Sequence, residues 1–338
     1  EEKTMKIILS CLMSVLFLFT SIQVQADDEA LQVLSLSAED IEPLSDGAGP
    51  LPKFELKCVT LHWDDLQYNK KNDLIHPSII KTKGRIKNPL GKYYLYYSPH
   101  KHKGVNLAYS DSLKGPWKEY EGNPLIKGVA APDIRWIEES GKFFMWAHGI
   151  NYHTDMWTTK DGVKFKKHSI AVHRNKVGTN NATYTRVYNY PIEQYDSKYI
   201  MLYSGVNTGD RAIWMAHSKD AKDWTQLTTP IVNAAPGEHK QIYGPSFLRY
   251  KQKNYIVYQD NTSNNSGGNI KYVSVNENFD PVGKGGQRYV LLNPPSSAPY
   301  NNRLRGAEFY QKGNKLHMIS GASGKYNEVL VRATAKLD

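Results

Sequence analysis

One type of segment recurs five times along the chain, and this repeat limits the fold more than any other feature. In each copy a lysine or asparagine precedes an apolar, aromatic-rich run. The copies are KYYLYYS from Lys92, KFFMWAH from Lys142, KYIMLYS from Lys198, NYIVYQD from Asn254 and KLHMISG from Lys315. Their starts lie 50, 56, 56 and 61 residues apart. Each copy is preceded by a second strand-like segment and followed by a third, so the repeating unit holds at least three short strands.

Short strands with turns between them, repeated without a convincing amphipathic helix, indicate a radial array of small antiparallel sheets. We therefore predict an all-β fold, a five-bladed β-propeller. The segment FELKCVTLHW, residues 54 to 63, is expected to complete the last blade and close the ring. A β-sandwich, which also uses short strands, is the alternative.

The N-terminal residues resemble an export signal. Lys6 precedes an apolar run over residues 7 to 19, and the small-x-small site Val24-Gln25-Ala26 follows. The run is shorter than the ~20 residues of a membrane-spanning helix. We expect a signal peptide within residues 1–26, an acidic lead-in over 27–53 and a catalytic propeller over 54–338. The protein is then secreted or periplasmic, without a membrane span, and Cys58 is a lone, inert thiol.

Charge is distributed unevenly along the chain. The formal net charge is +10, yet residues 27 to 65 carry ten acidic residues and two lysines, a net of −8. Because the first 26 residues are neutral overall, the remainder carries +18. An exported domain with this much positive charge is suited to binding a polyanionic ligand. Nucleic acid is not expected, since no recognition helix or zinc-finger pattern is present. We predict an anionic polysaccharide or oligosaccharide partner, the alternative being a solvated surface that binds nothing.

The first strand of every propeller blade lines the central channel, so the candidate site is assembled from five distant segments. The channel-lining candidates are His76, Asp133, Arg135, Arg186, Tyr188, Tyr243, Arg303, Arg305 and Glu308. Trp136 is a candidate sugar platform, and the histidines His100, His102, His148 and His153 are candidates at the channel mouth.

Three short motifs carry a family resemblance. HPSII with KYYLYYS, APDI, and YGPSF with NYIVYQ resemble the inner-strand motifs of glycoside hydrolase family 43 and of its relatives, including family 117. The likeness extends over residues ~70 to 338 through the repeat. It implies a five-bladed glycosidase in which Asp133 matches the aspartate that tunes the general acid. His76 and Tyr243 stand where family 43 has its other two catalytic carboxylates.

Hydrolysis with inversion needs two carboxyl groups roughly 6.5–9.5 Å apart, one as acid and one as base. Asp133 supplies one as base or acid modulator, and Glu308 is the best candidate for the acid, followed by Glu238. His76 can transfer protons near neutral pH or position a partner, and family 117 is similar in pairing a carboxylate with a histidine. Tyr243 is then a donor to the leaving oxygen. Hydrolysis of an anionic polysaccharide is the leading prediction.

Two alternatives stay open. A polysaccharide lyase needs a cation beside the uronate carboxylate and a base and an acid for elimination. Arg135, Arg186 or Arg305 suits the first role, and His76 with Tyr243 suits the others. A non-catalytic carbohydrate-binding propeller is the third interpretation. We expect no cofactor and no metal, although the resemblance allows a structural calcium for which no local motif names ligands.

Overall fold

The computed structural model describes residues 49 to 337, except 70–72, 100–103, 208, 237, 262–267, 283–285, 295–299, 301 and 325–326. The segment expected to be a signal peptide, most of the acidic lead-in, and His100 and His102 lie outside the described residues. None of the helices in the described ranges has the length and apolar character that a membrane crossing needs.

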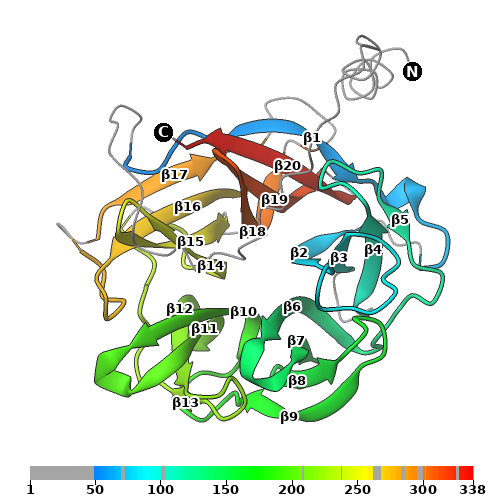
Figure 1. The fold of residues 1–338 in the computed structure, drawn as a ribbon. Coiled ribbons are helices and arrows are strands. Elements are labelled where there is room, and N and C mark those ends of the chain that lie inside the picture. The colour runs from blue at the N-terminus through cyan, green and yellow to red at the C-terminus, as the bar shows by residue number, and fades with distance from the viewer. Residues whose placement is uncertain are drawn as a thin grey trace.

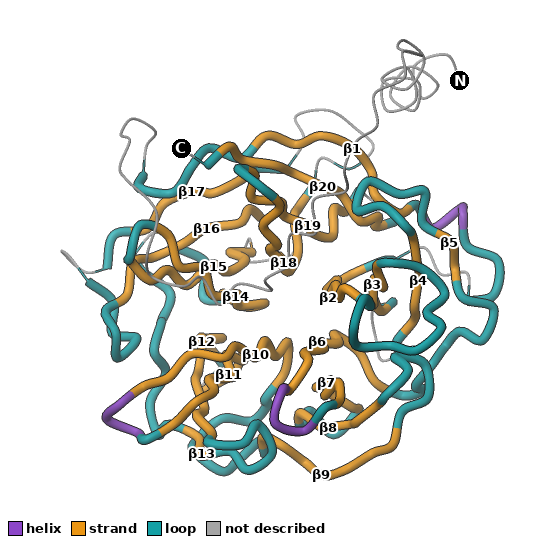
Figure 2. The backbone as a smooth tube through the Cα atoms, in the orientation of Figure 1, coloured by secondary structure: helices purple, strands orange, loops and turns teal. Residues whose placement is uncertain are grey.

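The described residues fold almost entirely into strands (Figures 1 and 2). They are β1 (Glu55–Leu61), β2 (Ile75–Lys81), β3 (Tyr93–Ser98), β4 (Asn106–Ser110), β5 (Lys118–Glu119), β6 (Val129–Ile137), β7 (Lys142–Gly149), β8 (Thr154–Thr159), β9 (Lys166–Val172), β10 (Thr183–Ile192), β11 (Ser197–Asn207), β12 (Asp210–Ser218), β13 (Thr225–Gln226), β14 (Ile242–Tyr250), β15 (Lys253–Asn261), β16 (Gly268–Val275), β17 (Arg288–Leu292), β18 (Arg303–Lys312), β19 (Lys315–Ser323) and β20 (Glu328–Lys336). Three single-turn 3₁₀ helices join them, η2 (Trp63–Asp65), η3 (Glu138–Ser140) and η4 (Glu193–Tyr195).

Strand pairing divides these elements into units of four around a centre. Strands β2 to β5, β6 to β9 and β10 to β13 each form an antiparallel sheet in chain order. Strands β14 to β17 form a fourth unit, and β18, β19, β20 and β1 form a fifth, which one parallel bridge from Gly268 to Arg303 joins to the fourth. The units follow one another around the ring, with β2, β6, β10, β14 and β18 innermost (Figure 1). The prediction of an all-β propeller is confirmed.

Each pair of neighbouring units encloses its own apolar core. The first and second units share a cluster around Phe143, and the second and third share one around Trp146. Ile256 marks the core between the third and fourth units, and Met318 the core between the fourth and fifth. The fifth core, around Ile319, joins the last unit to the first. Aromatic and branched side chains on alternate strand positions therefore hold the sheets face to face.

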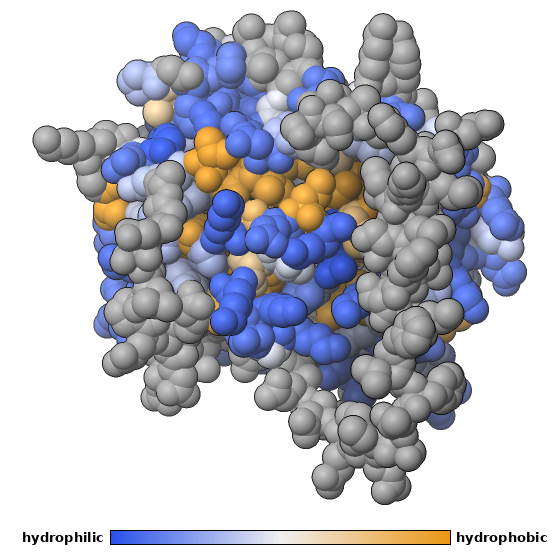
Figure 3. Space-filling model, turned by 90° about the horizontal axis from the view of Figure 1, so that it is seen from above, coloured by the Kyte–Doolittle hydropathy of each residue, from blue (hydrophilic) through white to orange (hydrophobic). Residues whose placement is uncertain are grey.

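The ring is closed by the N-terminal strand, as expected for residues 54 to 63. Strand β1 pairs antiparallel with β20, and Leu61 at its end opposes Leu330 in the core shared with the first unit. Earlier in the same strand the side chains of Leu56 and Val59 are exposed. Figure 3 looks onto the rim that carries β1 and β17, where hydrophobic residues gather among hydrophilic ones. Only the end of β1 therefore contributes to the core.

All five innermost strands share one backbone irregularity, which shapes the site. Each carries a β-bulge close to its start, where one residue adopts a left-handed conformation with φ between 49° and 61°. These equivalent residues are His76, Ala131, Tyr184, Gly244 and Gly306. The residue two positions further on in each strand forms a second layer, made of Ser78, Asp133, Arg186, Ser246 and Glu308.

We predict that ring closure can be tested on a single strand. Replacing Leu61 by alanine should lower the free energy of unfolding by about 2–5 kcal/mol, because its side chain is 3% exposed and a well-packed core collapses only in part around the cavity. The same change at Leu56, which is 37% exposed, should cost no more than about 0.5 kcal/mol. Urea unfolding measures both, and equal losses would contradict the assigned closure.

Candidate active site

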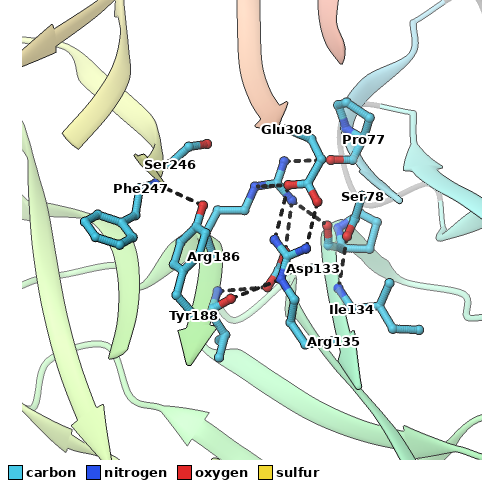
Figure 4. Close-up of polar contacts among 12 residues, drawn as sticks. Pro77, Ser78, Asp133, Ile134, Arg135, Arg186, Tyr188, Ser246, Phe247 and Glu308 are labelled. Carbon is cyan, nitrogen blue, oxygen red and sulfur yellow. Dashed lines mark hydrogen bonds and ion pairs between the residues drawn. The ribbon is translucent and has the colours of Figure 1, made fainter. Parts of the chain in front are cut away.

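The second layer, called the lower layer from here on, contains three charged residues. With Arg135 they form a buried network of four charges (Figure 4). Asp133, Arg135, Arg186 and Glu308 are at most 7% exposed. Arg135 donates through Nη1 to Glu308 Oε1 at 2.7 Å, and its Nη2 lies 2.7 Å from Asp133 Oδ1. Arg186 Nη1 lies 3.3 Å from that same Asp133 oxygen. Two carboxylates and two guanidiniums therefore neutralise one another inside the protein, as buried charges require.

The network also ties the units to one another through backbone groups. Arg186 donates to the carbonyl oxygen of Pro77 at 2.7 Å, and Arg135 donates through Nε to that of Val187 at 3.0 Å. The amide of Val187 donates to Asp133 Oδ2 at 2.8 Å. Burial raises the pKa of Asp133, while Arg135 and Arg186 act to lower it. For Arg135, burial acts to lower the pKa, but Asp133 and Glu308 raise it above its ordinary value.

This geometry bears on the roles expected for Asp133 and Glu308. Both oxygens of each carboxylate are engaged, and Arg135 Nη2 lies 2.7 Å from Asp133 Oδ1 and donates to Glu308 Oε2 at 3.2 Å. Two contacts to one nitrogen place those oxygens within about 6 Å of each other, closer than the roughly 6.5–9.5 Å that inverting hydrolysis needs for its attacking water. Because no oxygen of either carboxylate is left to meet a substrate, the arrangement favours a structural role for this pair.

The upper layer of the centre is aromatic. The rings of His76 and Tyr184 lie against each other, with centroids 4.5 Å apart. Tyr184 also meets His148 at 4.9 Å and Tyr243 at 5.3 Å. From the sequence, His76 and Tyr243 were expected in the channel and His148 at its mouth, whereas Tyr184 was not expected. Tyr184 contacts the other three rings and therefore holds the aromatic layer together.

Two glycines make room for His76. A Cβ atom on Gly306 would lie 2.3 Å from His76 Nδ1, and one on Gly244 would lie 3.1 Å from His76 Cε1. Both glycines adopt a left-handed conformation, which a side chain disfavours in any case. The imidazole of His76 therefore rests on bare backbone from the fourth and fifth units, and its position is fixed by packing.

Glu328, at the start of β20, adds a carboxylate to this layer. Its Oε1 lies 3.1 Å from Arg305 Nη2 and 3.3 Å from Arg303 Nη2. Its Oε2 is buried and has no hydrogen-bond partner in the described part of the protein. The pKa of Glu328 is raised to about 7, chiefly by burial and also by Asp73, while Arg305 acts to lower it. A carboxyl group with one uncommitted oxygen and a pKa near neutrality is suited to proton transfer.

Tyr243 is held by amides rather than by apolar packing alone. Gln259 Nε2 donates to its phenolic oxygen at 3.0 Å, and Asn261 Nδ2 does so at 2.6 Å. The guanidinium of Arg211 lies 5.0 Å from the centre of its ring. Burial raises the pKa of Tyr243, while Arg305 and Arg211 act to lower it. Because the oxygen already accepts two hydrogen bonds, its own proton can be donated elsewhere.

The other expected site residues lie apart from this layer. Tyr188 is buried below it and accepts a hydrogen bond from the amide of Phe247. Trp136 packs against Phe143 and donates to Glu138. His153 lies beside His173, with ring centroids 5.3 Å apart, and burial lowers its pKa.

Glu238, the second candidate acid, lies in the fourth unit. Its carboxylate accepts from the hydroxyl of Tyr258 at 2.7 Å and contacts Lys271 at 3.3 Å and Arg288 at 3.6 Å. The structure therefore places it in a separate ion cluster.

Three residues of the upper layer were missed by the sequence analysis: Tyr184, Arg211 and Glu328. Tyr184 is the second residue of the third inner strand, two residues before Arg186, and the equivalence with His76 becomes visible only once the bulges are aligned. Arg211 and Glu328 lie at or next to the start of outer strands, which a search of inner strands does not examine. Within the described ranges, no group of three or more His, Cys, Asp or Glu side chains could hold a metal ion.

Comparison with known proteins agrees with this fold. A solved structure of BT0996 in a complex with RGII is 13% identical to this protein, and the match covers 84% of this protein and 92% of the other, with a TM-score of 0.62. A thermostable family-43 glycoside hydrolase is 15% identical, with coverages of 79% and 92% and a TM-score of 0.53. An α-L-arabinofuranosidase from Lactobacillus brevis is 13% identical, with coverages of 78% and 92% and a TM-score of 0.54. No protein-family model and no curated protein matches the sequence. The protein therefore shares the propeller fold of glycoside hydrolases.

The charge network generates the first site prediction. Replacing Arg135 by alanine should lower the free energy of unfolding by about 3–5 kcal/mol, because it leaves buried carboxylates without their main partner. Replacing Lys198 by alanine removes an exposed ion pair to Glu139 and should cost less than about 1 kcal/mol. Denaturant titration compares the two proteins, and an Arg135 variant as stable as the Lys198 variant would refute the structural role.

The contact between Gly306 and His76 generates the second site prediction. Gly306 and Gly313 both have positive φ, at 51° and 55°, but a Cβ on Gly313 would meet nothing within 4 Å. Alanine at either position incurs the left-handed penalty, whereas alanine at Gly306 must also displace His76. We expect Gly306→Ala to cost about 1–3 kcal/mol more than Gly313→Ala, measured by thermal unfolding. Equal costs would show that His76 does not rest on Gly306.

Proposed function

We propose that this protein is an exported carbohydrate-active enzyme that hydrolyses glycosidic bonds in an anionic polysaccharide or its oligosaccharides. The observation that carries the proposal is Glu328, a buried carboxyl group with an uncommitted oxygen beside the aromatic layer in the described part of the protein. The fold shared with glycoside hydrolases supports hydrolysis as the reaction, as fold-level analogy. The apolar run and small-x-small site within residues 1–26 support export.

In this mechanism Glu328 is the general acid. Its protonated oxygen donates to the glycosidic oxygen, the bond from that oxygen to the anomeric carbon breaks, and a water molecule attacks the carbon. The proton that the water loses passes to the imidazole of His76, which Gly244 and Gly306 hold in place. Tyr184 packs against that imidazole and limits its movement. Arg303 and Arg305 hold the other oxygen of Glu328 and orient it.

The positive groups of the upper layer support an anionic substrate. Arg211 and Arg305 both act on Tyr184 and Tyr243 electrostatically, so they lie near the same aromatic rings. When Glu328 is protonated, Arg305 loses the negative charge of its ion pair with that residue. A uronate or sulfate group on the sugar would replace that charge. The net charge of +18 outside the first 65 residues would draw such a polymer toward the propeller.

A second candidate function, β-elimination, is favoured by the environment of Tyr243. Its phenolic oxygen accepts two amide hydrogen bonds, and burial raises its pKa, so the neutral phenol keeps a proton that it can donate. A phenol of this kind could protonate the leaving oxygen, while His76 removes the proton next to a uronate carboxylate and an arginine neutralises that carboxylate.

One assay separates these functions. The purified protein is incubated with pectin, alginate, ulvan and sulfated galactan, and reducing ends are followed together with absorbance near 235 nm. Hydrolysis predicts new reducing ends without absorbance, whereas elimination yields both signals because it creates an unsaturated uronate. Retardation in polysaccharide gels without either signal would leave a carbohydrate-binding propeller and overturn the enzymatic proposal.

The acid role of Glu328 predicts a particular pH dependence. Its pKa of about 7 lies above its ordinary value of 4.5, so the donor form dominates below pH 7 and declines above it. We expect activity to fall about tenfold for each pH unit above 7, and Glu328→Gln to lose roughly 10²–10⁴-fold in kcat while abolishing that decline. Glu121→Gln, at an exposed position, is the control and should retain the profile.

The same group links stability to pH. Because the folded protein holds this proton more tightly than the unfolded chain, stability contributed by Glu328 is fully present below about pH 4.5 and is lost as the pH rises through 7. Glu328→Gln should remove this part of the decline. A variant that keeps both the wild-type rate and the wild-type profile would exclude Glu328 as the acid.

A further inference from the structure

A second hollow lies at the opposite ends of the inner strands, between the third and fourth units. It is a groove of about 1010 Å³ lined by the end of β10, helix η4, the start of β11, Lys219 after β12, part of β14 and two residues after β16. Strand β10 runs from Tyr184 in the upper layer to Ile192 in this groove. Eight residues of strand separate the two, roughly 25 Å along an extended strand. The lining of the groove includes no residue of the charge network or of the upper layer, so the groove is distinct from the candidate active site.

Arg249 is the residue of this groove that most needs a ligand. It lies on β14, lines the groove, and its Nε is buried without a hydrogen-bond partner in the described part of the protein. Its guanidinium has no carboxylate partner within ion-pair distance among the described residues. Buried or half-buried guanidinium groups ordinarily have anionic partners, because leaving water without compensation is costly. An anion from outside the protein would supply that partner.

The other cations of the groove are already neutralised. Lys219 is paired with Asp196, and Lys198 lies 3.3 Å from Glu139. Arg249 is therefore where an added negative charge would gain most. A guanidinium also presents a planar fork of donors that matches a carboxylate or a sulfate.

The remaining lining suits a polar chain rather than an apolar partner. Asn189, Gln194 and Asn278 present exposed amides that can both donate and accept hydrogen bonds. Tyr190 is half-buried, fixed by ring contacts to Phe247 and Phe279, and lines the groove. The exposed carboxylates of Glu193 and Glu277 also line the groove, so an anionic group is favoured at Arg249 and not along the whole groove. The amides and the rigid ring suit the neutral part of a sugar chain, and Arg249, which has no ion pair among the described residues, suits its anionic substituent.

We propose that this groove is a second glycan-binding site, in which Arg249 binds a uronate carboxylate or a sulfate group of a polysaccharide. The inference rests on the proposed function because it takes the class of polymer from it. Binding at this groove does not require that the polymer is cleaved. A polymer held at both places would be retained near the reactive layer, since the second contact becomes intramolecular once the first has formed. Short fragments could occupy one site at a time and would gain nothing.

The test compares polysaccharide binding and cleavage kinetics of the Arg249→Gln variant with those of a control variant, Lys253→Gln. Lys253 is exposed, starts the strand that pairs with β14 and does not line the groove, so this control removes the same charge. Retardation is measured in gels cast with pectin, a uronate polymer, or with sulfated galactan, using the Glu328→Gln background to prevent cleavage. Arg249→Lys, which keeps the charge, and a thermal melt of every variant control for folding.

We expect Arg249→Gln to lose about tenfold in apparent affinity for one of the two polymers, and Lys253→Gln to lose almost nothing. In the active protein, KM for that polymer should rise by a similar factor while kcat and the KM for its tetramer stay unchanged. Loss with pectin alone identifies a carboxylate at Arg249, and loss with galactan alone identifies a sulfate. The proposal is overturned if Arg249→Gln and Lys253→Gln are retarded equally, or if neither polymer retards the Glu328→Gln protein from which both are made. If no polymer is cleaved but the Arg249-dependent retardation is observed, the proposed enzymatic function fails and this site stands.

Discussion

The propeller is organised around four buried charges. Asp133 and Arg135 come from the second unit, Arg186 from the third and Glu308 from the fifth, and Arg186 also binds the backbone of the first at Pro77. The fourth unit joins through the hydroxyl of Ser246, which donates to the carbonyl of Ala307. A propeller whose inner strands do not pair with one another needs some such link, because its apolar cores lie between the sheets and not at the axis.

This network divides the centre into two layers with different chemistry. Below, every carboxylate oxygen is engaged by arginine or backbone, so protons have no reason to move. In the upper layer, His76 packs on two glycines and the hydroxyl of Tyr243 accepts hydrogen bonds from two side-chain amides. Glu328 has one carboxylate oxygen without a hydrogen-bond partner among the described residues. The left-handed bulge in every inner strand separates the layers, since it turns His76 and Tyr184 away from the alternation that places Asp133 and Arg186 below.

Much of the fold was predictable from local patterns. The five aromatic runs and their spacing indicate repeated sheets, and the leftover strand at residues 54 to 63 has only the last unit to pair with. The residues of the charge network were also found, because APDIR, TRVY and RGAEF place charges on inner strands where apolar residues are the rule. Their roles were not predictable. A carboxylate looks the same in sequence whether two arginines saturate it or none does, and most of the arginine contacts to Asp133 and Glu308 cross from one unit to another.

The residues that were missed share a physical reason. Glu328 begins an outer strand, and only the folding of β20 against β19 brings it beside Arg305 on β18. Tyr184 is one more tyrosine in an aromatic-rich sequence until its backbone conformation is known. The family resemblance directed attention to the positions of His76 and Tyr243, which do lie in the upper layer, but it could not supply a replacement carboxylate from another strand.

The central claim is that Glu328, and not the saturated pair below it, exchanges a proton near neutral pH. The most direct measurement is a carbon-13 NMR titration of side-chain carboxyl groups in glutamate-labelled protein, with Glu328→Gln used to assign the resonance. The account predicts one glutamate signal that titrates near pH 7 and disappears in the variant. A Glu328 signal that titrates near 4.5, its ordinary value, would contradict the account and return the search for the acid to other residues.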